Sequence, residues 1–157
     1  MKESVKKIKM DQEIKELLSN PHVLELNSVI KINDREYYPK EHISSEGFKS
    51  VVWQGNDQYS MPVVIKLDTY DEYRGKSYVQ ELSLAAKLRN YRQFAQLYDA
   101  AIIELNLTEN KKYKVVCFIE EWVDGVTLEK YLEISGVRST FMLNYVNQMA
   151  EILNILT

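Results

Sequence analysis

The feature that most restricts the fold of this chain is a lysine at the end of an apolar strand, followed by a glutamate in a helix. Lys66 extends the run Val63-Val64-Ile65, which is typical of a buried strand. Glu81 follows on a predicted helix over residues 75–89, on the side where the apolar residues gather. A charged side chain that faces a core is costly unless it is paired. The two residues therefore predict a helix packed on the strand and joined to it by a Lys66–Glu81 ion pair.

One alternative leaves the two charges apart. The amine of Lys66 would then extend past the edge of the strand into water, and Glu81 would lie at the rim of the helix.

Composition indicates one ordinary globular domain. The chain has 157 residues, of which 45% are apolar and 27% charged, and its net charge of −3 argues against a nucleic-acid partner. Cys117 lies in an apolar run and is expected to be a buried thiol, and a single cysteine fits the reducing cytoplasm. No apolar stretch reaches the length of a membrane span, so we expect no membrane contact and a cytoplasmic location.

The first 28 residues are expected to be a helical extension. Residues 2–18 alternate charged and apolar side chains as an amphipathic helix does, and Ser19-Asn20-Pro21 should end it. This helix would pack on its own domain or on a neighbouring protein.

The middle of the chain predicts an antiparallel sheet. Residues 29–38 resemble a hairpin, the polar residues 44–47 a turn, and Gly55-Asn56-Asp57 a second turn. Strands are expected over residues 43–54 (interrupted by the first turn), 61–67, 97–104 and 113–119.

The last segment predicts two helices. Thr127 is a plausible N-cap for a short helix over residues 127–132, and a longer helix begins near Ser139. Its apolar residues, from Phe141 to Leu156, keep helical spacing up to the end of the sequence. We expect them to belong to a core that continues beyond Thr157, and to promote self-association in its absence.

These elements, in this order, resemble the N-terminal lobe of a protein kinase of the Ser/Thr type and the start of its C-terminal lobe. Val63-Val64-Ile65-Lys66 is similar to the V-A-I-K strand, whose lysine holds the α- and β-phosphates of ATP, and Glu81 is similar to the helix glutamate that orients this lysine. The resemblance implies an α+β fold with a five-stranded antiparallel sheet and one helix of the αC type over residues 29–123. Residues 124–157 would be the end of the hinge and the start of a truncated second lobe.

The resemblance also implies a nucleotide site. Residues 118–125 are similar to the fifth strand and hinge, so that Glu120 takes the gatekeeper position while Glu121 and Val123 offer backbone groups to adenine. Val51 and Val64 would enclose the adenine ring, and residues 43–48 would form the phosphate loop. The expected nucleotide-binding residues are Ile43, Ser44, Ser45, Glu46, Gly47, Phe48, Val51, Val64, Lys66, Glu120, Glu121 and Val123, with Lys66 and Glu81 as the catalytic pair.

The sequence departs from the kinase pattern in two ways. Ser44, Glu46 and Lys49 stand where G-x-G-x-x-G has glycines, and Glu46 would repel a phosphate. No H-R-D-x-x-x-x-N or D-F-G motif occurs, so the base and the Mg²⁺ ligands are expected outside this chain.

Three functions follow as hypotheses. The first is the ATP-binding lobe of a protein kinase, a transferase that is catalytically incomplete as this fragment and is completed by the rest of its kinase domain. The second is the same lobe from a small-molecule kinase of the aminoglycoside or choline type, which the glycine-poor loop favours. The third is a pseudokinase that binds a protein partner as a scaffold, which Glu46 and Glu120 favour.

Overall fold

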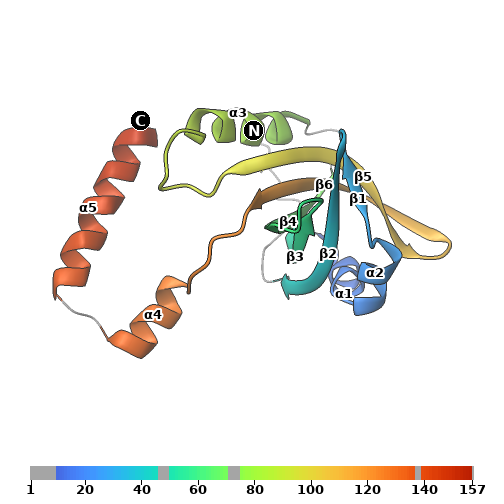
Figure 1. The fold of residues 1–157 in the computed structure, drawn as a ribbon, viewed down its shortest axis with the longest axis horizontal. Coiled ribbons are helices and arrows are strands. Elements are labelled where there is room, and N and C mark those ends of the chain that lie inside the picture. Colours follow the sequence, from blue (N-terminus) through green and yellow to red (C-terminus); the bar gives the residue numbers. More distant parts are fainter. Residues whose placement is uncertain (1–9, 46–49, 71–74, 137–138, 157) are drawn as a thin grey trace, which may run out of the picture. The chain divides into compact units, whose positions relative to one another are not determined.

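The computed structural model describes residues 10–45, 50–70, 75–136 and 139–156, in two compact units. The first unit spans Met1–Trp122 and the second Val123–Thr157. The first unit contains the sheet and three of the helices (Figure 1).

The first unit has an α+β fold around an antiparallel sheet in the order β1-β2-β3-β4-β6-β5. The strands are β1 (Ile30–Ile32), β2 (Arg35–Ser44), β3 (Ser50–Asp57), β4 (Pro62–Thr69), β5 (Leu97–Thr108) and β6 (Lys111–Glu121). The sheet has six strands, so the expected number of five is wrong. The predicted hairpin is present, but its first strand, β1, joins the sheet as an additional edge, turning at Asn33 with φ of 54°.

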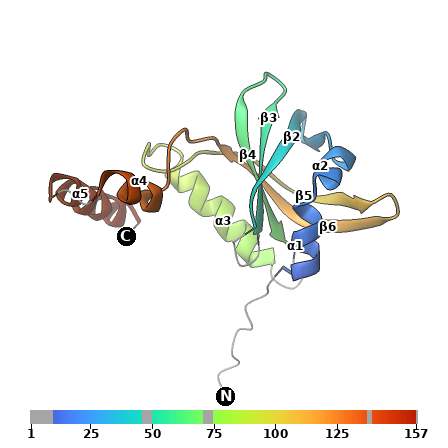
Figure 2. The same ribbon diagram turned by 90° about the horizontal axis from the view of Figure 1, so that it is seen from below.

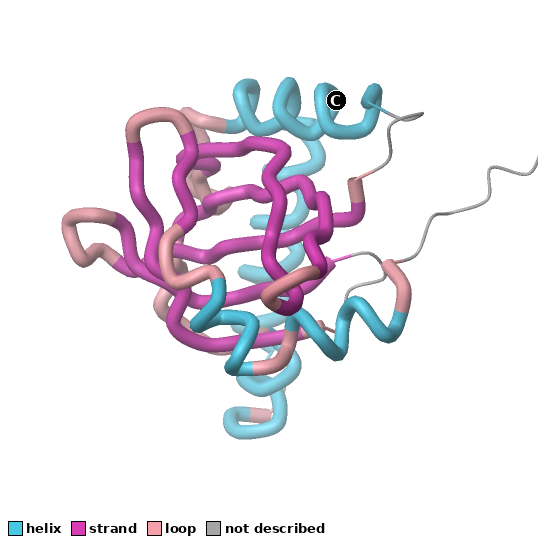
Figure 3. Tube along the Cα trace, turned by 90° about the vertical axis from the view of Figure 1, so that its right-hand side faces the viewer, coloured by secondary structure: helices cyan, strands magenta, loops and turns pink. Residues whose placement is uncertain are grey.

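The sheet curls until its two edges approach each other, which gives a nearly closed barrel (Figure 3). Side chains join the edges: the hydroxyl of Tyr37 on β2 donates to Asp99 Oδ2 on β5 at 3.0 Å. Asn33 Nδ2, in the β1–β2 turn, donates to Asp99 Oδ1 at 2.9 Å. We call this junction the seam of the barrel.

The inside of the curled sheet is the hydrophobic core. Alternate residues of each strand point inward, as the two-residue period of a strand requires. Trp53, Ile65 and Ile119 are fully buried there. Cys117 is also fully buried, as predicted, and burial raises the pKa of its thiol.

Two short helices, α1 (Gln12–Leu18) and α2 (Pro21–Leu26), contribute to this core (Figure 1). Asp11 caps α1 by accepting from Glu13 N at 2.9 Å, and residues 1–9 of the predicted helix lie outside the described residues. The predicted end of this helix is confirmed, because α1 stops at Leu18 and its C-cap is Ser19. Pro21 has a further role. It begins α2, because a proline at the first helical position loses no hydrogen bond. The N-terminal segment therefore packs on its own domain.

The outer face of the sheet carries the third helix, α3 (Gly75–Leu88), which crosses it in Figure 2. Val116 and Phe118 of β6 point to this face and are buried, and the rings of Tyr78 and Phe118 lie 5.9 Å apart.

The second unit consists of α4 (Leu128–Ser135) and α5 (Ser139–Leu156). The hydroxyl of Thr127 caps α4 by accepting from Lys130 N at 3.2 Å, as predicted. Tyr131 stacks on Phe141 at 4.9 Å between ring centroids, while Leu143 and Leu153 of α5 are more than 60% exposed. Among the described residues, no helix is long and apolar enough to cross a membrane.

The contact between α1 and the core can be tested at Trp53. Its indole Nε1 donates to the carbonyl of Leu18 at 2.8 Å, and the indole is fully buried. We expect Trp53→Phe to lower the free energy of unfolding by about 1–3 kcal/mol, because it leaves a buried carbonyl without its donor. Urea denaturation measures the loss. Trp122→Phe, at a half-buried position, is the control, and an equal loss in both variants would contradict a specific role for this hydrogen bond.

Gly55 gives a second test. The sequence predicts a turn at Gly55-Asn56-Asp57, but β3 continues to Asp57 and Gly55 lies opposite Pro39 of β2. A Cβ at Gly55 would lie 2.7 Å from the carbonyl oxygen of Tyr38 and 2.8 Å from Ile65 Cδ1. The glycine therefore permits close packing within the sheet rather than a turn.

We expect Gly55→Ala to lower the free energy of unfolding by about 1–3 kcal/mol through this crowding. Gly125→Ala is the matched control, because nothing lies within 4 Å of a Cβ there. Urea denaturation of both variants decides the matter, and an unchanged Gly55→Ala protein would refute the steric argument.

Candidate functional site

The site is built where α3 crosses β4. Along β4, Val63, Ile65 and Leu67 point into the core, which leaves Val64, Lys66 and Asp68 on the outer face. Glu81 lies on the side of α3 that faces the sheet, and its Oε1 accepts from Lys66 Nζ at 2.8 Å. The ion pair that the sequence predicts is therefore present.

Two further carboxylates surround Lys66. The amine lies 3.8 Å from Oδ2 of Asp68, a residue that is 3% exposed. Glu120 of β6 lies directly opposite Val64 and points to the same face. Phe118 completes the surroundings, with Lys66 Nζ 5.0 Å from its ring centroid. Lys66 therefore lies near three carboxylates of the described residues, those of Asp68, Glu81 and Glu120.

These charges alter the acidity of the groups. Burial lowers the pKa of the Lys66 amine, but the hydrogen bond to Glu81 and the charges of Asp68, Glu81 and Glu120 outweigh it and raise that pKa. Burial raises the pKa of the Glu120 carboxyl, the charge of Lys66 lowers it, and Glu81 and Asp68 raise it further. The net effect keeps Lys66 protonated and makes Glu120 easier to protonate.

The adenine site needs a correction at Val51. Val51 is fully buried in the core and lies opposite Leu67, so it points away from Val64 and Lys66. The structure brings Val52 to the outer face instead, where it lies opposite Lys66. A one-residue difference along a strand exchanges the two faces, so Val51 cannot enclose a ligand together with Val64.

Glu121, which the sequence places in the hinge at the end of β6, already forms hydrogen bonds to Gln96. The backbone N–H of Glu121 donates to the carbonyl of Gln96 at 2.8 Å, and its Oε2 accepts from Gln96 N at 3.0 Å. The backbone N–H of Glu121 is therefore already engaged within the first unit and is not available to an adenine. Val123 belongs to the second unit and is 64% exposed.

The predicted phosphate loop is described in part. Glu46, Gly47 and Phe48 lie outside the described residues, while Ile43 and Ser44 end β2, with Ile43 45% exposed. Ser45, the next residue, accepts at its carbonyl from Lys15 Nζ of α1 at 3.3 Å.

A second contact joins the N-terminal segment to the same end of β2. Ser19, which follows α1, lies 3.1 Å through its Oγ from His42 Nε2. The N-terminal segment thus braces the strand that leads into the loop. Sequence reasoning missed this role of Lys15 and His42, because no local pattern signals contacts between residues that are 30 and 23 positions apart.

Sequence reasoning also missed Asp68. The alternation that places Lys66 on the outer face places Asp68 there as well, so the period of β4 contained this signal.

A pocket of about 190 Å³ lies beside the ion pair, between α3 and β6. Glu81 and Glu120 line its polar part, and Leu88, Phe94 and Phe118 its apolar part. Among the described residues, no group of His, Cys, Asp or Glu is arranged to hold a metal ion.

Comparison of the sequence with models of protein families finds no match, and comparison with curated proteins finds none either. The assignment of a function therefore depends on the geometry above.

The raised pKa of Glu120 gives a pH-dependent prediction. A carboxyl whose pKa is raised on folding destabilises the protein above that pKa, and the penalty disappears as the pH falls below 4.5, the ordinary pKa of a glutamate carboxyl. We expect Glu120→Gln to raise the free energy of unfolding at pH 7 and to have little effect at pH 4.

The gain should stay below about 1 kcal/mol, because water reaches this half-buried group. Urea denaturation at the two pH values measures it, with Glu133→Gln on α4 as an exposed control. A loss of stability at pH 7 would show that the attraction of Glu120 to Lys66 outweighs its burial.

Proposed function

We propose that this chain is the ATP-binding lobe of a protein kinase of the Ser/Thr type. The observation that carries the proposal is the 2.8 Å ion pair between Lys66 of a central strand and Glu81 of the helix packed on it. In kinases, a pair of this kind holds the α- and β-phosphates of ATP. Lys66 would bind the phosphates, and Glu81 would fix its direction.

The connections of the sheet support the proposal. Helix α3 follows β4 in the chain, and the sheet then continues with β5 and β6, of which β6 returns to lie beside β4. This arrangement brings Glu120 and Glu121, at the end of β6, next to Val63 and Val64 of the lysine strand. Adenine contacts and phosphate contacts can therefore come from neighbouring strands.

We assign nucleotide binding to this lobe, and not phosphoryl transfer. Catalysis of phosphoryl transfer needs a base and carboxylates for Mg²⁺, which the sequence motifs of this chain do not provide. The active enzyme would consist of this lobe and a second lobe that supplies them.

A second candidate function is a pseudokinase scaffold that binds a protein partner. Asp68 at 3.8 Å and Glu120 on the same face add negative charge around Lys66, which opposes the approach of a phosphate. Glu46, in the predicted phosphate loop, would repel a phosphate as well.

Thermal-shift titration with Mg-ATP separates the two candidates. A ligand that binds the folded state stabilises it by RT ln(1 + [L]/Kd), about 2.7 kcal/mol at a concentration of 100 times Kd. We expect a rise in melting temperature with millimolar nucleotide, and we expect Lys66→Ala to abolish this rise.

The rise must be compared within each variant, because Lys66→Ala also removes the ion pair with Glu81 and can change the stability of the protein by itself. Lys87 is an exposed lysine of α3, the helix that carries Glu81. The control variant Lys87→Ala should keep the full rise in melting temperature with nucleotide. A full effect in Lys66→Ala would refute the phosphate role of Lys66. No effect in the unsubstituted protein would favour the scaffold.

A further inference from the structure

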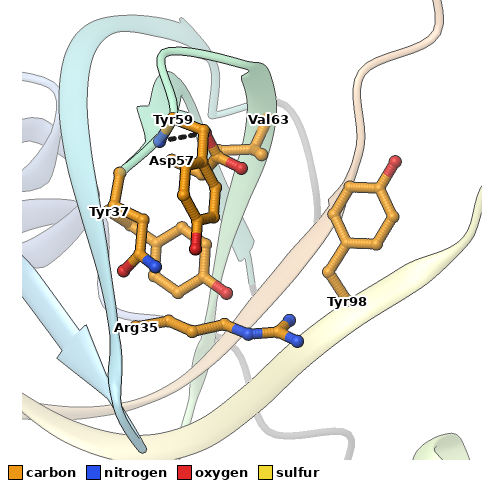
Figure 4. A pocket seen from close by; sticks show the side chains of 7 residues that line it. Arg35, Tyr37, Asp57, Tyr59, Val63 and Tyr98 are labelled. Atoms are coloured by element: carbon orange, nitrogen blue, oxygen red, sulfur yellow. Dashed lines mark hydrogen bonds between the residues drawn. The ribbon is translucent and has the colours of Figure 1, made fainter.

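A second pocket, of about 300 Å³, lies at the rim of the barrel, on the side of the sheet away from Lys66. It forms where β2 begins, β3 ends, β4 begins and β5 begins (Figure 4). The nucleotide site proposed above uses none of its residues. We propose that this pocket binds a flat aromatic carboxylate, with the carboxylate on Arg35 and the ring between tyrosine side chains.

The base of the pocket is held in place by a chain of hydrogen bonds. The ring of Tyr37 is 2% exposed, and its hydroxyl donates to Asp99 Oδ2 at 3.0 Å. Asp99 also accepts from Asn33 at 2.9 Å, so both of its oxygens are engaged. Arg35 hydrogen-bonds to Tyr37, and this contact together with the nearby carboxylate of Asp99 raises the pKa of the guanidinium.

A tight turn holds the opposite wall. Asp57 Oδ1 accepts from the backbone N–H groups of Tyr59 at 2.9 Å and Met61 at 2.8 Å. Ser60 takes a φ of 66°, which L-residues adopt mainly in such turns. This turn sets the ring of Tyr59 over the pocket, although Tyr59 itself is 77% exposed (Figure 4).

A β-bulge supplies the third tyrosine. On β5, Leu97 lies opposite Glu120 and Asp99 lies opposite Ile119, so Tyr98 is an extra residue against β6. A bulge of this kind redirects a side chain. Tyr98 is thereby turned toward the pocket, where it is 46% exposed (Figure 4).

The side chains that line this pocket indicate which class of ligand it binds. Arg35 extends toward Tyr98 with Tyr37 and Tyr59 on its other side (Figure 4). Within the described part of the chain, no carboxylate lies within 4 Å of this guanidinium, which leaves a forked donor for a planar acceptor. Tyrosine rings add contact area for a flat ring at a low cost in side-chain entropy.

The charge of the surroundings favours a carboxylate over a phosphate. Asp57 lines the pocket and Asp99 lies behind Tyr37, so a dianion would meet more repulsion than a monoanion. The ligand is therefore expected to carry a single negative charge.

The test uses the whole chain and two probes of the same shape, 2-naphthoate and its uncharged amide, 2-naphthamide. Isothermal titration calorimetry should show binding of the carboxylate and binding at least about tenfold weaker of the amide, because the amide lacks the charge-assisted hydrogen bond. Arg35→Gln should weaken the carboxylate by a similar factor and leave the amide nearly unchanged. Tyr59→Ala should weaken both probes.

Arg92→Gln and Tyr91→Ala are the matched controls, since both residues are exposed and lie outside this pocket. Circular dichroism melts show whether each variant is folded, and Arg35 and Tyr59 are exposed enough for substitution to leave the core intact. No binding of 2-naphthoate at millimolar concentration would overturn the proposal. Equal binding of both probes, or binding that Arg35→Gln does not change, would overturn the role of Arg35. These outcomes are independent of whether the chain binds ATP.

Discussion

The alternation of side chains along β4 is the constraint on which both functional surfaces depend. A central strand has one face toward the core and one face away from it. In β4, every second residue is apolar and points into the core, while Val64, Lys66 and Asp68 lie on the outer face. Because β3 lies on one side of β4 and β6 on the other, the same alternation fixes which residues of those strands face Lys66. Helix α3 is then joined to the sheet by Glu81.

The environment of Lys66 links this packing to the proposed function. A lysine that held only Glu81 would form a neutral pair, and a phosphate could approach it with little opposition. With Asp68 and Glu120 on the same face, these four side chains carry one positive charge and two or three negative charges, so their sum is negative whether or not Glu120 is protonated. A bound nucleotide would therefore need Mg²⁺ as much to offset these carboxylates as to assist chemistry.

Much of the fold could be predicted from local sequence patterns. The strands over β3, β4 and β6, the helix α3, the N-cap at Thr127 and the Lys66–Glu81 pair all follow from periodicity or from the cost of burying a charge. The face of Val51 could not be read in this way, because it depends on where the register of β3 starts relative to β4. The contacts of Lys15 and His42 with the end of β2 join distant segments, which no local pattern reports.

The seam of the barrel has a consequence for the motions of the protein. Among the residues that the structure describes, β1 pairs with β2 alone and β5 with β6 alone, so no backbone ladder crosses the seam there. The side chains of Asn33, Tyr37 and Asp99 span it instead. Opening along this line would leave each described strand pair intact, but it would also separate α2 from β5, where Asn27 Nδ2 donates to the carbonyl of Asn106 at 2.8 Å and Asn27 Oδ1 accepts from Asn106 N at 2.9 Å. Within the sheet, amide hydrogen exchange should be faster at the two edges than in β4, and a ligand bound to both Arg35 of β2 and Tyr98 of β5 would join the two sides of the seam.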